Sequence, residues 1–538
     1  MKCNLFFIIF LLGTIGFFGS CSNFLDETPN KSGSAYIYHM DQLYGMTGSP
    51  DLYYLSYPDD FSYGSVEPFM YHQLLLGDAV EFDPQFWFVG YQTSLSSAYE
   101  IYQWNEDKLE DQFTMNVMWT PAYNRIYTFN TVLENMDKVV QTTENIRHQV
   151  EGEARFGRAY YHFMLLTQFG LWAEDAPGIG YREDTEATGI PERQTVGYTL
   201  SRIYEDLQQA ETALTKAGRT SFDFKRNFRP TVPTVQAFRA RVDLYRGNYE
   251  SALQNASAAL QAHHTLVDFK NDPLYKLYPS TEYHFLDPTD SKVEKSITAQ
   301  VMTDINNRWG ELIPEYEELF LPNISSMDYG GHAPISESFY SLFDRENDAR
   351  WIHFYNNYTP LAWADGVVQT LEIDGKKIEC CIKWADQQWL KPAWFHTYSR
   401  FNETTHGIIG MTTAEMYLTK AECLARSGQT EEAAEILKTL RRTRFMNDAS
   451  ADNIGGSVQE VLDERQREMG GIWRFFDIKR LNGAENAGIS IRRKVLSDLS
   501  DLNSVIELVI TPDDPRWALP FNPQEAENMG WQQNTGWK

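Results

Sequence analysis

The chain has 538 residues, enough for a large buried core and, at about 100–200 residues per domain, for two to five domains. Apolar residues make up 42% of the chain and charged residues 22%, a composition that excludes an intrinsically disordered chain and one embedded in a membrane. Asp and Glu total 74 against 47 for Lys and Arg. The resulting net charge of −27 argues against nucleic acid as a partner and against a polybasic attachment to anionic lipid.

The amino-terminal residues have the pattern of an export signal. Residues 5–18 form an almost unbroken apolar run, which is shorter than the roughly 20 residues that span a bilayer and is typical of a secretory signal. Ser20 followed by Cys21 resembles the cleavage and lipidation site of a bacterial lipoprotein. We therefore expect residues 1–20 to be a signal peptide, Cys21 to carry acyl chains that hold the protein at a membrane, and residues 21–34 to form a polar tether. The alternative is an ordinary signal cut near Ser20, which leaves Cys21 as a free thiol.

Helical periodicity dominates the first part of the body. Apolar residues recur at helical spacing over residues 153–169, and Gly170 stands where a C-terminal cap is expected. A second helix is predicted over residues 199–214, ending near Gly218. The other expected segments are helices near 92–112 and 117–140 and a Gly-, Pro- and acid-rich loop over 170–195.

Two later segments have the pattern of helix pairs. Helices over 234–245 and 249–260 flank Gly247, and small residues recur on their facing sides, a pattern that resembles half of a tetratricopeptide repeat. A similar pattern returns around Gly428, within residues 412–445. Together with the helices from about residue 36 to residue 260, these pairs predict a mainly α fold. Its core is a tetratricopeptide-like helix-pair scaffold, an α-α superhelix in which stacked pairs bury a continuous core.

The character of the chain changes between the two pairs. Residues 265–410 are rich in Pro, Gly and aromatic residues, and short alternating runs at 296–301 and 371–373 predict strands. We expect a loop-rich irregular half that carries short strands. Irregular segments on a rigid scaffold are where binding surfaces usually lie, so this half is predicted to carry ligand contacts.

Exposed rings beside short polar side chains suit a carbohydrate ligand, because rings stack on the apolar faces of sugars and polar groups bind the hydroxyls. Aromatic residues make up 14% of the chain. The candidate ligand-binding residues are Asp78, Asp83, Trp87, Trp309 and Tyr329. The alternative for the rings is ordinary core packing, and for the carboxylates a solvated loop.

Five segments in this order resemble the SusD/RagB family of outer-membrane lipoproteins from Bacteroidetes. They are Cys21 to Pro29; the helix at 153–170; the helix pair at 234–260; the pair at 414–442; and a tail with Glu464-Arg465-Gln466-Arg467-Glu468, Arg474-Phe475-Phe476-Asp477-Ile478-Lys479-Arg480, Leu519-Pro520, Gln533-Asn534 and Gly536-Trp537. The stretch 469–473 departs from the family pattern, because it is about one residue short.

The resemblance implies one SusD-like domain over residues 35–538, with four tetratricopeptide-like helix pairs and packing motifs at 458–538. It also implies a lipid-anchored protein of the outer membrane that faces the cell surface. Such a protein would cap a SusC-like TonB-dependent transporter and deliver an oligosaccharide or other nutrient to it.

The sequence contains no H-E-x-x-H, G-x-S-x-G, Walker or C-x-x-C pattern, and we expect no enzymatic activity and no cofactor. A structural calcium ion held by loop carboxylates is compatible with the composition, although no EF-hand spacing occurs. Two other functions remain open. One is a lipid-anchored enzyme that degrades glycans with a pair of carboxylates. The other is a helical-repeat scaffold without a small ligand.

Arg474 and Asp477 in the tail resemble a pair of catalytic ions. At a spacing of three residues on a helix, however, they are expected to make a structural pairing, within the helix or between the helix and the tail.

Overall fold

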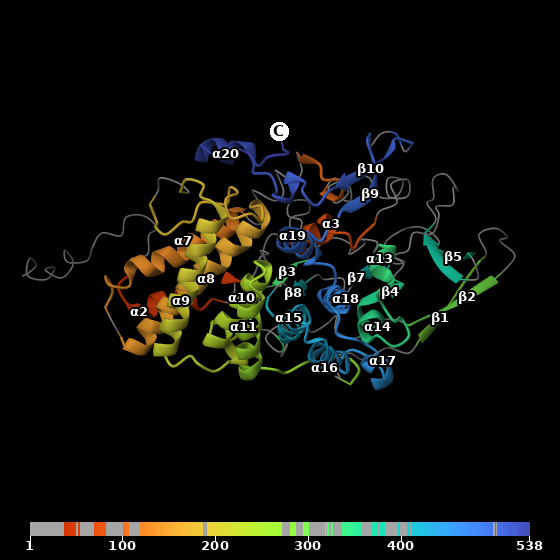
Figure 1. The fold of residues 1–538 in the computed structure, drawn as a ribbon, viewed down its shortest axis with the longest axis horizontal. Coiled ribbons are helices and arrows are strands. Elements are labelled where there is room, and N and C mark those ends of the chain that lie inside the picture. Colours follow the sequence, from red (N-terminus) through yellow and green to blue (C-terminus); the bar gives the residue numbers. More distant parts are fainter. Residues whose placement is uncertain are drawn as a thin grey trace, which may run out of the picture.

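The computed structural model describes the helical body of the chain and parts of its irregular half (Figure 1). The described residues are 37–49, 52–53, 69–81, 101–106, 119–140, 142–186, 191–271, 280–286, 294–300, 318, 320–321, 324–326, 336–357, 368–373, 376–381, 396–398, 406–408, 410–498, 501 and 503–537. The predicted signal peptide, Cys21 and the tether lie outside them.

The amino-terminal half is built around one long helix, α8 (Glu144–Phe169). Most residues from 152 to 169 are buried, because α7 (Trp119–Asn135), α9 (Val196–Lys216) and the short α2 (Met40–Thr47) all pack against α8. The helices predicted near 117–140 and over 153–169 and 199–214 are confirmed. The helix α8 begins earlier than predicted, at a cap made by the side chain of Thr143. The sequence did not indicate this start, because the first turns are polar and show little periodicity.

Both predicted helix pairs are present. They are α10 (Val232–Tyr245) with α11 (Tyr249–Ala262), and α15 (Thr413–Arg426) with α16 (Thr430–Arg441). The turn glycines Gly247 and Gly428 have φ of +72° and +82°, a left-handed conformation that other residues adopt only with strain. Ala252 and Ala433 are fully buried, as the close approach of the paired helices requires.

The two pairs are neighbours in space although more than 140 residues separate them in sequence. Helix α11 packs directly against α15, so the second pair continues the stack that the first pair begins (Figure 1). The irregular half is thus an insertion between adjacent members of one helical array. This arrangement confirms the mainly α, tetratricopeptide-like scaffold.

The irregular half contains short antiparallel strand pairs. The strand predicted at 371–373 lies within β5 (Val368–Ile373), and residues 296–300 of the strand predicted at 296–301 lie within β2 (Glu294–Gln300). The other described elements of this half are β1 (Ser280–Leu286), β3 (Ile324–Ser326), α13 (Glu337–Tyr340), α14 (Ala349–Phe354), β4 (Tyr355–Asn357), β6 (Lys376–Cys381), β7 (His396–Tyr398) and β8 (His406–Ile408). Strand β1 pairs with β2, β5 with β6, β3 with β8 and β4 with β7.

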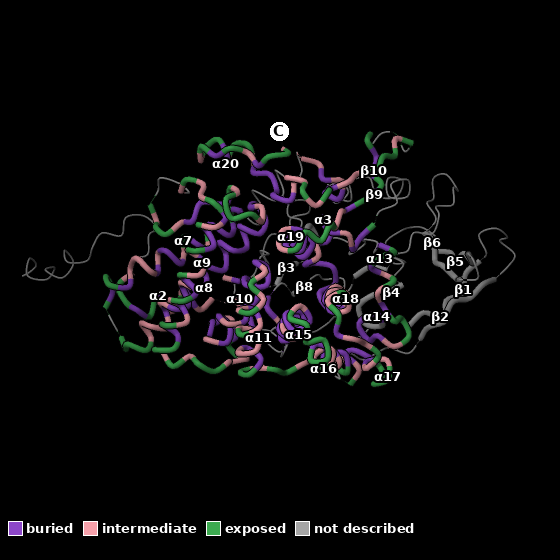
Figure 2. Tube along the Cα trace, in the orientation of Figure 1, coloured by how far each residue is buried: buried purple, intermediate pink, exposed green. Residues whose placement is uncertain are grey.

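The C-terminal segment returns across the helical body; most of its helix at 474–485 is buried, whereas its last helix at 523–529 is mostly exposed (Figure 2). Its elements are α17 (Asp448–Asp452), α18 (Val458–Met469), α19 (Arg474–Glu485), β9 (Ile491–Leu496), β10 (Val505–Ile510), the 3-10 helix η6 (Pro515–Trp517) and α20 (Pro523–Met529). Helix α18 packs on α15, and α19 packs on α3 (Phe69–Leu76). The C-terminal segment therefore lies beside the end of α3, where the first candidate binding segment starts.

The tail also closes the carboxyl end of α8. The last four carbonyl groups of a helix lack partners within it. Here Leu166 accepts from the N–H of Gly170, Thr167 from Lys479 Nζ at 2.8 Å, Gln168 from the N–H of Leu519 at 3.0 Å, and Phe169 from Asn534 Nδ2 at 2.9 Å. Burial lowers the pKa of Lys479 to about 7. Three motif residues of the tail, Lys479, Leu519 and Asn534, thus complete the end of the central helix.

Candidate functional site

The described part of the candidate site is the junction where the end of α3 meets α13, α19 and β9. Of the predicted ligand-binding residues, only Asp78 belongs to it. The predicted residues Asp83, Trp87, Trp309 and Tyr329 lie outside the described residues. The site is therefore described from the described segments that lie beside those residues in the sequence.

Arg493 holds two segments together at this junction. Its guanidinium group donates hydrogen bonds to the main-chain carbonyl groups of Leu75, Leu76, Gly77 and Tyr102, at 2.8 Å for Leu75 and 3.3 Å for Leu76. It also lies 4.1 Å from the centroid of the Tyr102 ring. The chain that leads into residues 82–100 and the chain that leaves them are thus attached to one side chain.

The inward position of Arg493 follows from the pleat of β9. Ile491, Arg493 and Val495 alternate with exposed residues and point into the core. Arg493 is 4% exposed, and burial lowers the pKa of its guanidinium group. A buried guanidinium is costly unless its donors are satisfied, and the carbonyl groups at the end of α3 and of Tyr102 supply acceptors for Nη1 and Nη2.

Asp78 makes a two-pronged ion pair with Arg474, the first residue of α19. Arg474 Nε lies 2.7 Å from one carboxylate oxygen of Asp78, and Nη2 lies 2.9 Å from the other. The side chains are 29% and 12% exposed, respectively. This planar fork is the strong geometry for an arginine and a carboxylate, and it fixes the segment that follows α3 to the start of α19.

Ser336 joins this segment to the irregular half. Its N–H donates to the carbonyl of Ala79 at 2.9 Å, and its hydroxyl donates to the carbonyl of Asp78 at 2.7 Å. Ser336 immediately follows the chain that contains the candidate Tyr329, and β3, just before that chain, contacts α3. Two candidate binding segments that are distant in sequence therefore start or end at the same place.

Two glycines allow this close packing. Gly470 and Gly471 end α18 with φ of +60° and +76°, and a Cβ atom on Gly471 would overlap the side chain of Ala79. Only glycine combines this backbone conformation with the space available. These residues lie in the stretch 469–473 that departs from the family pattern.

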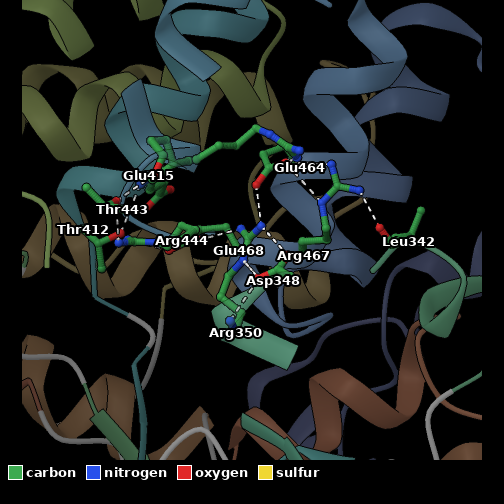
Figure 3. A network of polar contacts seen from close by, with 12 residues as sticks. Leu342, Asp348, Arg350, Thr412, Glu415, Thr443, Arg444, Glu464, Arg467 and Glu468 are labelled. Atoms are coloured by element: carbon green, nitrogen blue, oxygen red, sulfur yellow. Dashed lines mark hydrogen bonds and ion pairs between the residues drawn. The ribbon is translucent and has the colours of Figure 1, made fainter. Parts of the chain in front are cut away.

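A second charged cluster lies between α14, α16 and α18 (Figure 3). Arg350 pairs with Asp348 at 2.8 Å, Glu464 at 2.7 Å and Glu468 at 2.9 Å, and Arg444 pairs with Glu468 at 2.9 Å. Burial by itself raises the pKa of Glu464, but the surrounding guanidinium groups hold that pKa well below its ordinary value. A carboxylate held ionised in this way, as Glu464 is, cannot act as a general acid, and the carboxylates of the cluster are bound to arginines, which indicates a structural role.

The structural role expected for Arg474 and Asp477 is confirmed, but the two residues pair with other partners and not with each other. Arg474 pairs with Asp78, near the other end of the chain. Asp477 pairs within its helix with Arg480 at 2.7 Å and across to Arg465 at 2.9 Å. The two ions therefore form no common site.

Comparison with known families agrees with the fold and the motifs. Residues 80–244 match a SusD-like family model described as "Starch-binding associating with outer membrane", and residues 383–537 match the SusD family model. The chain belongs to the SusD/RagB family. In this SusD-like chain the first match ends before the irregular half begins, and the second starts within that half.

Relatives of this SusD-like chain are distant in sequence but similar in length. A SusD-like protein of Formosa agariphila is 21% identical over 403 residues, which cover 71% of this chain and 75% of that protein. A SusD superfamily crystal structure from Bacteroides thetaiotaomicron is 18% identical, with a TM-score of 0.59, and covers 92% of this chain and 99% of its own. Surface glycan-binding protein A from Bacteroides uniformis is 16% identical, with a TM-score of 0.55, covering 92% and 98%. A laminarin-binding SusD-like protein is 14% identical, with a TM-score of 0.53, covering 93% and 100%. These structures share the fold of the SusD-like chain.

Two further features concern the described residues of this SusD-like chain: groups of metal ligands and membrane-spanning helices. Within them, no group of three or more His, Cys, Asp or Glu side chains converges where a metal ion could bind. None of the described helices combines the length and the apolar composition needed to cross a bilayer.

Two residues that shape the junction, Arg493 and Ser336, were not predicted from the sequence. Arg493 could have been noticed because the run Ile491-Arg-Arg-Lys-Val495 places one arginine on the same side of a strand as two apolar residues. Ser336 has no comparable signal, since only the fold brings it to Asp78 and Ala79.

Proposed function

We propose that this SusD/RagB-family chain is a glycan-binding protein of the outer membrane. It captures an oligosaccharide at the cell surface and passes it, uncleaved, to a SusC-like TonB-dependent transporter. The observation that carries the proposal is the family match at both ends of the chain. Solved structures with the same fold include a surface glycan-binding protein and a laminarin-binding protein, which supports a carbohydrate ligand.

The proposed ligand contacts are the predicted rings and polar groups. Trp87 and Trp309 would stack on sugar faces, while Asp83 and Tyr329 would bind hydroxyl groups. The hydrogen bonds of Ser336 to residues 78 and 79 support this grouping, because they bring the chain before Trp87 to the chain after Tyr329. Stacking with few charges gives modest affinity, which suits a protein that must release its ligand to a transporter.

Replacing Trp87 and Trp309 together with Ala is expected to weaken polysaccharide binding at least about tenfold, since each ring contributes on the order of 1 kcal/mol. Affinity electrophoresis against a panel of polysaccharides, including laminarin and starch, measures the effect. The control is Tyr198→Ala, which removes an exposed ring from α9 in the helical half and should leave migration unchanged.

The outcomes separate the three functions. Unchanged retardation of the double variant would remove both rings from the site. Sugar products released by the purified wild-type protein would show an enzyme, and the absence of retardation by any polysaccharide would favour a scaffold without a small ligand.

We further propose that the mature chain starts at a lipidated Cys21, continues through a tether to residue 34, and folds as one domain from residue 35. Cells fed radioactive palmitate should label the wild-type protein and not Cys21→Ser. The control Cys423→Ala removes a free, buried thiol and should keep the label. Label on the Cys21→Ser protein would contradict the anchor.

A further inference from the structure

We infer that Asp78 and Arg493 are positioning residues for the proposed glycan site: together they fix residues 75–79 and Tyr102, which flank residues 82–100 in the sequence, to the packed body. This inference rests on the proposed function and deepens it. It gives Asp78 a role through the main chain in place of direct contact with a sugar, and it adds Arg493, which the sequence had not indicated.

The first step is the geometry of Arg493. Its acceptors come from two buried segments, residues 75–77 and Tyr102, which are separated in sequence by residues 78–101. A guanidinium group offers five N–H donors in a rigid plane, so it sets the relative position of several acceptors at once. Lysine, with donors at a single point, cannot reproduce this arrangement.

The second step is the state of Asp78. Both oxygens of its carboxylate accept hydrogen bonds from Arg474, and its main-chain carbonyl accepts one from Ser336. A sugar hydroxyl that approached this carboxylate would compete with a charge-assisted fork, which is about twice as strong as a neutral hydrogen bond. The contacts of Asp78 therefore hold the segment to α19 and α13.

The third step is the link to binding. Binding costs less conformational free energy when the groups that contact the ligand are already in place. Arg493, Arg474 and Ser336 attach residues 75–79 to β9, α19 and α13, and those elements are parts of the packed body. Loss of any one attachment should reduce affinity without removing a sugar contact.

The test compares Asp78→Asn, Arg493→Lys and the exchanged pair Asp78→Arg/Arg474→Asp, with laminarin and soluble starch as probes. Asp78→Asn and Arg493→Lys should each bind about tenfold more weakly than wild type. The exchanged pair should recover to within about twofold, because the ion pair is restored with its charges reversed. Arg492→Gln changes the neighbouring, exposed arginine of β9 and should bind like wild type.

Urea unfolding of each variant accompanies the binding measurement. Since Asp78 and Arg474 are partly exposed, Asp78→Asn should lower stability by less than about 1 kcal/mol and remain folded, even if Arg493→Lys does not. Folded Asp78→Asn that binds like wild type would overturn the inference. So would an exchanged pair that binds no better than Asp78→Asn, since that result shows that restoring the ion pair does not restore binding. Wild-type protein that binds neither these probes nor any polysaccharide of the panel contradicts the proposed function itself, and the inference falls with it.

Discussion

Arg444→Met is expected to lower the free energy of unfolding by about 3–5 kcal/mol, because it leaves a buried carboxylate without a cation. Arg444 is fully buried and donates to Glu318 at 2.8 Å and to Glu468 at 2.9 Å. Glu468 keeps a second arginine, Arg350. Glu318 keeps only the N–H of Val267 in the described structure, so most of the loss comes from Glu318.

Chemical denaturation of the purified protein measures this loss, and the control lies two residues away. Arg442 pairs with Asp452 at the surface, where the two side chains are 48% and 39% exposed. Arg442→Met should cost much less, because solvent screens the attraction between exposed charges. Adding Glu318→Gln to Arg444→Met should recover part of the loss. Equal stabilities of the two single variants would show that the buried network contributes no more than a surface pair.

Gly157→Ala is expected to destabilise the protein by about 1–3 kcal/mol, although Ala favours a helix by about 1 kcal/mol over Gly. Gly157 lies in the middle of α8 and faces the ring of Phe129 on α7. A Cβ atom at this position would overlap the ring. Phe129 is fully buried, so it cannot move aside without disturbing the core.

The matched control is Gly45→Ala on α2. A Cβ atom on Gly45 would meet nothing within 4 Å, so the helix preference of Ala acts alone. The free energy of unfolding should rise by up to about 1 kcal/mol. Opposite signs for the two glycine substitutions, read from the same denaturation experiment, support the close packing of α7 on α8. A gain in stability at Gly157 would contradict it.

Much of the fold could be predicted because its helices are amphipathic and because a helix is formed by interactions between residues close in sequence. The pairs around Gly247 and Gly428 were found from local spacing, since a turn glycine and buried small residues are needed wherever two helices approach closely. The start of α8 was missed because polar residues 144–152 carry no periodicity, and a side-chain cap at Thr143 sets the boundary.

The candidate site was predicted only in part. Asp78 was chosen for its residue type and neighbours, and these say nothing of Arg474, 396 residues away in sequence. The partners of Asp477 were likewise outside the reach of local pattern, because Arg465 approaches it from another helix. Polar pairings between distant segments depend on how the elements pack, and periodicity carries no such information.

From residue order and spacing alone came the helical class, the two tetratricopeptide-like pairs and the irregular segment between them, while the SusD/RagB family came from the resemblance of the motifs. These depend on interactions within a few residues of one another, which a linear pattern records. Only the tertiary structure decided that the two pairs are adjacent, that the tail closes α8, and that Arg493 and Ser336 hold the segment of Asp78. Each of these joins residues that are remote in sequence, and their meeting is a property of packing in three dimensions.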